Sequence, residues 1–289
     1  MNPVVYLQKS GVGFTRLIPA KLVDKMAIFA GLLYCYFSKR KRDYIISNLK
    51  HIFAGDIIGQ EQLNYLLKRT FTNFALTMTD FFRLAFMSKQ DIINSSECFG
   101  YEHVAQALAQ GSGCVLITLH LGNWDYAGAY LAARGVPMTA LVEETDAEML
   151  ALYTKHREST GMRTYPVNRA GYAFLDIIKN NRVLALLADR DVVKNGIPIN
   201  FFSGKRMIPK GLAEIIIKKR IPVVFAYMVL QTSSRRARYL GIIEEPFVYD
   251  GEADSFNRLM VDKFEGFIKQ YPEQWFVFHP EWIEEGANT

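Results

Sequence analysis

Cysteine is scarce in the sequence, and the few cysteines do not form a metal-binding or disulfide pattern. Cys35, Cys98 and Cys114 are spread over 289 residues, and no two of them form a C-x-x-C pair. No local cluster of histidine, cysteine and aspartate supplies a set of metal ligands either. A free cysteine is usually a small buried hydrophobic residue. We therefore expect three reduced thiols in a protein that faces the cytosol, with neither a metal ion nor another bound cofactor.

Long hydrophobic runs are also missing. The best one, MAIFAGLLYCYF at Met26–Phe37, would form a helix of about 18 Å, which is shorter than the ~30 Å core of a bilayer. The N-terminus lacks the charged, apolar and small-residue regions of a signal peptide. Because Lys21 and Lys25 precede the run and Lys39–Arg42 follow it, we expect an amphipathic or partly inserted helix at a membrane surface. A helix buried in the protein core is the alternative.

The charge of the chain is only mildly positive, with a net charge of +5 and an isoelectric point of about 8.9. Such a charge suits an anionic membrane surface or a phosphate-bearing substrate. No nucleic-acid-binding signature is present, so a nucleic acid is not an expected partner. The basic cluster Lys39–Arg42 fits contact with lipid headgroups and a solvated turn equally well.

Two common enzyme motifs are absent. A serine hydrolase of the α/β type carries G-x-S-x-G at a turn from strand to helix, and no such motif occurs. The nearest candidate, GSGC at 111–114, precedes a predicted strand instead of following it. The G-x-G-x-x-G turn of dinucleotide-binding oxidoreductases is missing as well. These absences weigh against a serine hydrolase and against a dinucleotide-dependent enzyme.

What the chain does contain is enough apolar residues, 50% of the total, for one large core. Residues 16–86 have apolar positions at helical spacing, whereas strands and helices alternate later in the chain. Continuous apolar runs at 113–120 and 182–189 are typical of strands buried on both faces. We predict an α/β fold, with a central, mostly parallel or mixed sheet flanked by helices and a helical, membrane-facing N-terminal segment. Residues 1–94 would form this membrane-associating segment and residues 95–289 the core, within one continuous structural domain.

The segment HLGNWD contains the strongest catalytic candidates. His120 ends the first buried strand, and Asp125 lies five residues later, in the first turn of the next helix. A carboxylate at that place can reach back to one imidazole nitrogen and leave the other free as a general base. The same spacing fits a structural histidine and an aspartate favoured by the helix dipole. Asp189 ends the second buried strand, so His120 and Asp189 both fall on the rim where α/β sheets bind ligands.

Several motifs in one order carry a resemblance to a known family. HLGNWD is followed by DRD at Asp189–Asp191 and FFSGKRMIPKG at Phe201–Gly211, and RDYIISNLKHIF at Arg42–Phe53 precedes it. This series resembles the late acyltransferases of lipid A biosynthesis, including phosphatidylinositol mannoside acyltransferase-like relatives. These enzymes belong to the wider glycerolipid and lysophospholipid acyltransferase superfamily. The similarity extends over most of the chain.

The resemblance implies transfer of a fatty acyl chain from acyl-carrier protein or acyl-CoA to a hydroxyl of a glycolipid, here a lipid A precursor. Another phospholipid or glycolipid, such as a phosphatidylinositol mannoside, is the alternative acceptor. A non-catalytic lipid-binding protein of the same fold is the alternative function. The thioester is a co-substrate, and the resemblance implies no cofactor. It also implies a peripheral or monotopic protein on the cytoplasmic face of the bacterial inner membrane.

In the family the histidine is the general base and the aspartate of the same motif orients it, which carries over to His120 and Asp125. The backbone N–H groups of Gly122 and Asn123, at a helix start, are candidate oxyanion donors. The other substrate-binding candidates are charged residues near strand ends and in the basic block: Glu143, Arg169, Asp189, Arg190, Asp191, Lys205, Arg206 and Lys210. Alternatively, Glu143 is an exposed carboxylate in a loop, and the cations form a solvated basic surface.

Overall fold

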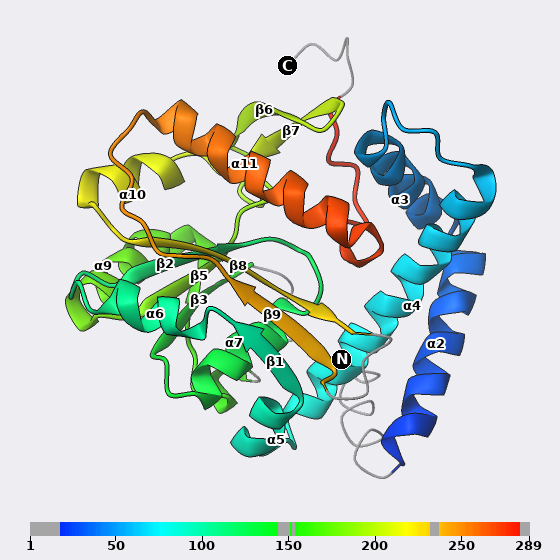
Figure 1. Ribbon diagram of the computed structural model, residues 1–289, viewed down its shortest axis with the longest axis horizontal. Helices are drawn as coiled ribbons and strands as arrows, with labels where there is room; N and C mark the ends of the chain where they lie inside the picture. Colours follow the sequence, from blue (N-terminus) through cyan, green and yellow to red (C-terminus); the bar gives the residue numbers. More distant parts are fainter. Residues whose placement is uncertain (1–17, 144–150, 152–153, 156, 232–236, 284–289) are drawn as a thin grey trace.

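The computed structural model describes residues 18–143, 151, 154–155, 157–231 and 237–283 (Figure 1). Residues 1–17 of the expected N-terminal segment and residues 284–289 of the expected core lie outside these ranges. The division of the chain into segments 1–94 and 95–289 stays a prediction.

Within the described residues, a seven-stranded sheet has the strand order β1-β9-β8-β2-β5-β3-β4. Its neighbouring strands run parallel, except that β8 and β9 are antiparallel. The prediction of a mostly parallel or mixed sheet flanked by helices is therefore confirmed. The strands are β1 (Ser96–Phe99), β2 (Cys114–Thr118), β3 (Met138–Val142), β4 (Arg163–Pro166), β5 (Val183–Leu187), β8 (Val223–Leu230) and β9 (Tyr239–Ile243).

The sheet separates two hydrophobic cores, one on each face. Val115 and Ile117 of β2 belong to one core, whereas Cys114 and Leu116 belong to the other, because successive side chains of a strand point to opposite faces. This double burial explains why the strand is apolar throughout. The first face is covered by α9 (Ala170–Asn180), α10 (Leu212–Lys219) and α11 (Ala253–Gln270), and the second by α6 (Tyr101–Leu108) and α7 (Trp124–Ala133) (Figure 1).

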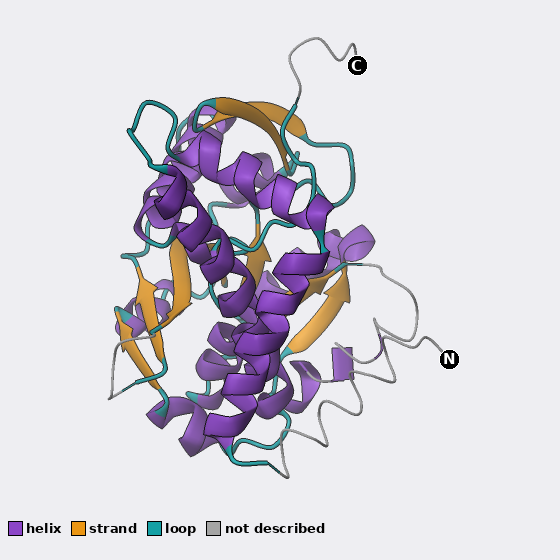
Figure 2. Ribbon diagram, turned by 90° about the vertical axis from the view of Figure 1, so that its right-hand side faces the viewer, coloured by secondary structure: helices purple, strands orange, loops and turns teal. Residues whose placement is uncertain are grey.

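The N-terminal segment is helical, as predicted, and Figure 2 shows helices in front of the sheet on this side of the molecule. Its helices are α2 (Ala20–Phe37), α3 (Lys39–Ile52), α4 (Gln60–Leu84) and α5 (Lys89–Asn94). Helix α2 lies along α4 at close range, since a Cβ atom added to Gly31 would be 2.8 Å from the carbonyl oxygen of Phe71. Among the described residues, no helix combines the length and the apolar character that a bilayer crossing requires.

The basic block at 201–211 forms a β-hairpin and the start of α10. Strands β6 (Ile197–Phe201) and β7 (Gly204–Ile208) pair in antiparallel fashion beside α11. In β7, Lys205 is exposed and Arg206 is buried, as the alternation of side chains along a strand requires. Two short 3₁₀ helices, η1 (Val167–Arg169) and η2 (Pro272–Gln274), complete the described elements.

Candidate active site

The ends of β2 and β5 bring the two central residues of the site together. Thr118 is the register partner of Leu187, and the Ala188 N–H donates to the Thr118 carbonyl oxygen at 3.0 Å. His120 and Asp189 follow directly beyond these strand ends. Because β2 and β5 are parallel neighbours, both residues lie on one rim of the sheet, where open α/β sheets bind ligands. The predicted rim position of both residues is therefore confirmed.

His120 and Asp189 form a close hydrogen-bonded pair. The imidazole Nδ1 atom lies 2.7 Å from Oδ1 of Asp189, and the backbone N–H of His120 donates to the same oxygen at 3.2 Å. The second carboxylate oxygen accepts a hydrogen bond from the Trp275 indole N–H at 2.9 Å. Asp189 is fully buried, whereas the His120 side chain is 16% exposed. Three hydrogen bonds thus fix the Asp189 carboxylate beside the Nδ1 edge of the imidazole.

Within the described residues, Asp125 makes no hydrogen bond or ion pair with the His120 imidazole, so the structure does not show the predicted contact, and the orienting role of Asp125 stays a prediction. Its carboxylate accepts instead from Nε of Arg157 at 2.7 Å. The cause is the turn that starts α7, in which the Asn123 side chain accepts from the Tyr126 N–H and caps the helix. Asp125 then lies in the first turn of α7. The preceding residue, Trp124, packs its ring edge-on against the His120 imidazole.

The charge state of Asp189 follows from its surroundings. Burial alone would raise the pKa of this carboxyl. The charge and hydrogen bond of His120, the Arg206 guanidinium and the Trp275 N–H offset that effect and hold the pKa far below its usual range. Asp189 is therefore a carboxylate wherever the protein is folded near neutral pH, and it acts only as an acceptor.

The backbone of Gly122 and Asn123 does not supply the predicted oxyanion donors. The Gly122 N–H donates to the Gln274 carbonyl oxygen at 2.8 Å, and the Asn123 N–H donates to that of Met228 at 2.8 Å. Both N–H groups are therefore used within the fold. Gly122 has a φ of 64°, and a Cβ atom there would be 2.0 Å from the Met228 carbonyl oxygen. These two residues thus shape the turn that carries His120, and neither of them is among the described residues that line the cavity beside it.

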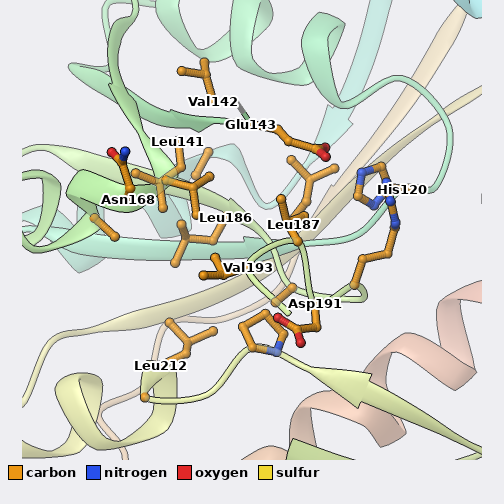
Figure 3. Close-up of a pocket in the computed structure, with 18 of the residues that line it drawn as sticks. His120, Leu141, Val142, Glu143, Asn168, Leu186, Leu187, Asp191, Val193 and Leu212 are labelled. Atoms are coloured by element: carbon orange, nitrogen blue, oxygen red, sulfur yellow. The ribbon is translucent and has the colours of Figure 1, made fainter. Parts of the chain in front are cut away.

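His120 borders a cavity of about 640 Å³ on the first face of the sheet. Figure 3 shows how side chains from β3, β5 and the start of α10 surround it. Most of its wall is apolar, with Leu141, Val142, Leu186, Val193 and Leu212 among the lining residues. The cavity offers an apolar chain a protected place beside the imidazole.

The charged candidates from the sequence divide into three groups. Glu143, Arg190, Asp191 and Lys210 line the cavity. Arg169 and Lys205 are exposed and do not line it, so the structure does not bring them to the site. Asp189 and Arg206 are fully buried, which is incompatible with the direct substrate contact predicted for them. Arg206 looked like a surface cation because lysines flank it in the basic block.

Three further residues of the site escaped the sequence analysis. Trp275 donates to Asp189, Arg157 pairs with Asp125, and Asn168 lines the cavity. Trp275 and Arg157 lie far from HLGNWD in the sequence, and no motif marks either of them. A signal for Asn168 was present, because it directly precedes Arg169, which the sequence analysis had named as a substrate-binding candidate.

The described part of the chain contains no group of three or more histidine, cysteine, aspartate or glutamate residues that could hold a metal ion. The three cysteines are free thiols, with Cys35 and Cys114 buried and Cys98 half-buried. None of the three lines the cavity beside His120.

Comparison with known proteins assigns the chain to a family. Residues 4–284 match the family described as bacterial lipid A biosynthesis acyltransferase. A phosphatidylinositol mannoside acyltransferase of Mycolicibacterium smegmatis is 26% identical over 223 residues, which are 75% of this chain and 72% of that protein. Its counterpart in Mycobacterium tuberculosis is 27% identical over 66% of this chain and 61% of its own length.

A lipid A biosynthesis acyltransferase of Haemophilus influenzae is 23% identical over 89% of this chain and 80% of that protein. The match to the family thus covers the HLGNWD, DRD and basic motifs together, and the relatives are named for acyl transfer to two different lipids. The chain belongs to the bacterial lipid A biosynthesis acyltransferase family and is an enzyme of the O-acyltransferase class.

Proposed function

We propose that His120 is the general base of an acyl transfer and that Asp189 holds its imidazole in the productive orientation. Ionised Asp189 can only accept, so Nδ1 of His120 carries the proton of their hydrogen bond. The lone pair of the imidazole is then on Nε2. Among the described residues Nε2 has no hydrogen-bond partner, so it is free to accept a proton from a substrate hydroxyl.

The reaction follows from that assignment. Nε2 takes the proton of the acceptor hydroxyl while its oxygen attacks the thioester carbonyl carbon. The resulting tetrahedral oxyanion collapses, the carbon–sulfur bond breaks, and the leaving sulfur takes the proton from the imidazolium. An ester and a free thiol are formed, and His120 is again neutral. No covalent acyl-enzyme is required, because the histidine acts on the hydroxyl directly.

The observation that carries this proposal is the hydrogen-bonded imidazole at the border of an apolar cavity. The fatty acyl chain of the thioester would lie against Leu141, Leu186 and Leu212, which removes apolar surface from water. A bound chain would hold the carbonyl carbon near His120, and such positioning accounts for a large part of enzymatic rate enhancement.

The polar part of the cavity lining suits the headgroup ends of the two substrates. Arg190 and Lys210 are cations that can bind phosphate, as found in acyl-CoA, in the arm of acyl-carrier protein and in phosphorylated glycolipids. Figure 3 places the Glu143 carboxylate on the same side of the cavity as His120, where it can accept hydrogen bonds from sugar hydroxyls. We infer an acceptor that is a glycolipid, with a lipid A precursor as the first candidate and a phosphatidylinositol mannoside as the second.

Helix α2 provides a surface for membrane attachment. Its exposed large apolar side chains are Leu22, Met26, Ile28, Phe29, Leu32, Leu33, Tyr34, Tyr36 and Phe37. A water-soluble surface rarely carries so many apolar side chains on one helix, and an amphipathic helix of this kind lies in the headgroup region. The cations at the start of α3 follow directly, and anionic lipids attract such clusters. We infer a peripheral or monotopic enzyme on the cytoplasmic face of the inner membrane.

The function is tested with purified protein, thioesters of acyl-carrier protein and of CoA in a series of chain lengths, and vesicles that contain a lipid A precursor or a phosphatidylinositol mannoside. Mass spectrometry should detect an added acyl ester on one of the two lipids. Figure 3 draws Leu141 across the cavity from His120, so Leu141→Trp should shift the preference to shorter acyl chains. Lipid binding without any ester product would favour the non-catalytic lipid-binding protein instead.

A further inference from the structure

Arg206 is a fully buried cation for which the substrate-binding assignment leaves no role. It lies on β7 with an exposed fraction of 0%, and among the described residues Nε, Nη1 and Nη2 have no hydrogen-bond partner. Burial lowers the pKa of its guanidinium to about 10, which keeps it positively charged at neutral pH. An arginine that is buried without hydrogen bonds is unfavourable unless its charge interacts with something nearby.

Aromatic rings surround the guanidinium. Its carbon lies 5.3 Å from the ring centre of Phe201, 4.7 Å from that of Trp275 and 5.2 Å from that of Trp282. The faces of aromatic rings attract cations, Trp most strongly, and this attraction increases where water is excluded. The rings stabilise the charge but do not neutralise it, so the positive field of Arg206 extends to its neighbours.

That field acts on the catalytic pair. Trp275 packs against the Arg206 guanidinium and donates its indole N–H to Oδ2 of Asp189, whose Oδ1 contacts His120. Cation, indole, carboxylate and imidazole therefore follow one another in a continuous series. The charge of Arg206 contributes to the low pKa of Asp189. The other carboxylate near Arg206 is Glu281, at 4.0 Å from Nη2, and Glu281 also pairs with Arg190 at the cavity.

We propose that Arg206 is a positioning residue that acts through Asp189: its buried charge keeps Asp189 from making His120 too basic. This inference rests on the proposed role of His120 as general base. Asp189 alone would favour the imidazolium, which cannot accept a proton from a hydroxyl. A positive charge behind the carboxylate opposes this proton uptake by the imidazole.

The effect of Arg206 on His120 can be separated from the effects of the other charged residues around the imidazole. The charged residues of the cavity lining are Asp125, Glu143, Arg157, Arg190, Asp191 and Lys210. Three of these are held in ion pairs: Asp125 and Arg157 pair with each other, away from Arg206, and Arg190 pairs with Glu281, the carboxylate that also lies 4.0 Å from Nη2 of Arg206. Among the described residues only Asp189 contacts the imidazole through a charged group. Removal of Arg206 thus changes the field at His120 mainly through the buried side of Asp189.

The test is a pH titration of the histidine imidazoles by NMR in the full-length protein, with the ring carbons labelled. It needs no substrate, so its outcome is independent of whether acyl transfer is detected. Single His→Gln variants assign the signals of His51, His103 and His120. In Arg206→Met the titration midpoint of His120 should move to higher pH by roughly one unit. Arg206→Lys, which keeps a positive charge, should move it much less.

Two other histidines serve as internal references. His51 stacks on Trp282, and its pKa is lowered by burial and by the charge of Arg206, so its midpoint should also rise in Arg206→Met. His103 lies on α6, on the opposite face of the sheet, and should not move. A matched control is Arg182→Met, which removes a largely buried arginine that pairs with Asp176 instead. It should leave the His120 midpoint unchanged.

A shift of His51 without a shift of His120 in Arg206→Met would overturn the proposal, because the loss of charge would then be felt only locally. Should Arg206→Met fail to fold, Glu281→Gln replaces it. Glu281 is 17% exposed and its loss removes a negative charge beside Arg206 and Arg190. The His120 midpoint should then move to lower pH, and an unchanged or higher midpoint would contradict the proposal.

Discussion

Nδ1 of His120 lies 2.7 Å from Oδ1 of Asp189, although 69 residues separate the two in the chain. The parallel pairing of β2 with β5 produces this contact, since it places the two strand ends side by side. The aspartate that is near in sequence, Asp125, pairs with Arg157. The carboxylate that contacts the imidazole therefore comes from the end of the neighbouring strand, and we propose that it orients His120.

Replacing Asp189 and Asp125 one at a time tests which of the two carboxylates orients His120. In Asp189→Asn an amide stands where the imidazole and the indole need an acceptor, so the tautomer and orientation of His120 are no longer held. We expect kcat to fall by roughly 10²–10⁴-fold, as for the orienting aspartate of a catalytic triad. Asp125→Asn loses a partly exposed ion pair with Arg157 and should lower kcat by less than about tenfold.

Steady-state kinetics of the two purified variants, with circular dichroism to verify the fold, provides the comparison. A larger loss of kcat in Asp125→Asn than in Asp189→Asn would show that the HLGNWD motif orients His120 by itself after all.

The exposed side of α2 should determine vesicle binding. Phe29 and Phe37 are 63% and 75% exposed, so their replacement by serine removes apolar surface without opening the core. We expect each substitution to weaken binding to anionic vesicles by about tenfold, from the transfer free energy of one aromatic side chain. The melting temperature should hardly change.

Co-sedimentation with vesicles measures this affinity. Tyr172→Ser is the control, because Tyr172 is 66% exposed on α9 and away from α2. If Phe29→Ser and Phe37→Ser bind as tightly as the unmodified protein, α2 is not the membrane-binding element.

A buried charge network joins α2 to the core, and its loss should destabilise the protein. Asp80 is 1% exposed and accepts from Arg238 and from the Tyr239 hydroxyl, each at 2.6 Å. Tyr239 in turn accepts from the Asn123 side chain at 2.8 Å, so the network reaches the turn after His120. Arg238 also pairs with Asp24 of α2 at 2.8 Å, so Asp80→Asn removes the more buried of its two carboxylate partners and leaves the other. The loss of these charge-assisted hydrogen bonds should lower the free energy of unfolding by about 1.5–3 kcal/mol.

Denaturant unfolding tests that value. The double variant Asp80→Asn with Arg238→Met should lose less than the sum of the single variants, because the two residues interact directly. Additive losses of unfolding free energy would mean that the interaction between Asp80 and Arg238 does not stabilise the protein.

The thiols should be unreactive in the folded protein. Burial raises the pKa of Cys98 to about 11 and that of Cys114 to about 12. A raised pKa keeps the thiol protonated to higher pH, so at ~pH 8 roughly one Cys98 side chain in a thousand is the reactive thiolate. Mass spectrometry after iodoacetamide treatment should find both residues unmodified unless the protein is first unfolded in urea. Rapid modification of Cys98 in the folded state would contradict this prediction.

The sheet and the rim of the site could be predicted because their signals are local. The apolar runs at 113–120 and 182–189 are continuous, which only strands covered on both faces require. Their polar ends, His120 and Asp189, therefore had to meet at one rim once the strands were parallel. The alternation of strands and helices made that arrangement the expected one.

The partners of these residues could not be predicted, because they depend on register and on tertiary packing. Asp125 and Asp189 are both carboxylates near a strand end, and only the pairing of β2 with β5 decides between them. The N–H groups of Gly122 and Asn123 donate to carbonyl groups that lie more than a hundred residues away in the sequence. Arg206 points inward because side chains alternate between the two faces of β7, and the hairpin that contains β7 was not predicted from the sequence.

The most direct test of the central claim is the rate of acyl transfer by His120→Ala, measured with the same thioester and acceptor lipid as for the unmodified protein. His103→Ala, on the far face of the sheet, is the matched control and should retain its rate. With His120 as general base, kcat of His120→Ala should fall by roughly 10²–10⁴-fold while the thioester still binds. Transfer by His120→Ala within a few-fold of the unmodified rate would contradict the account.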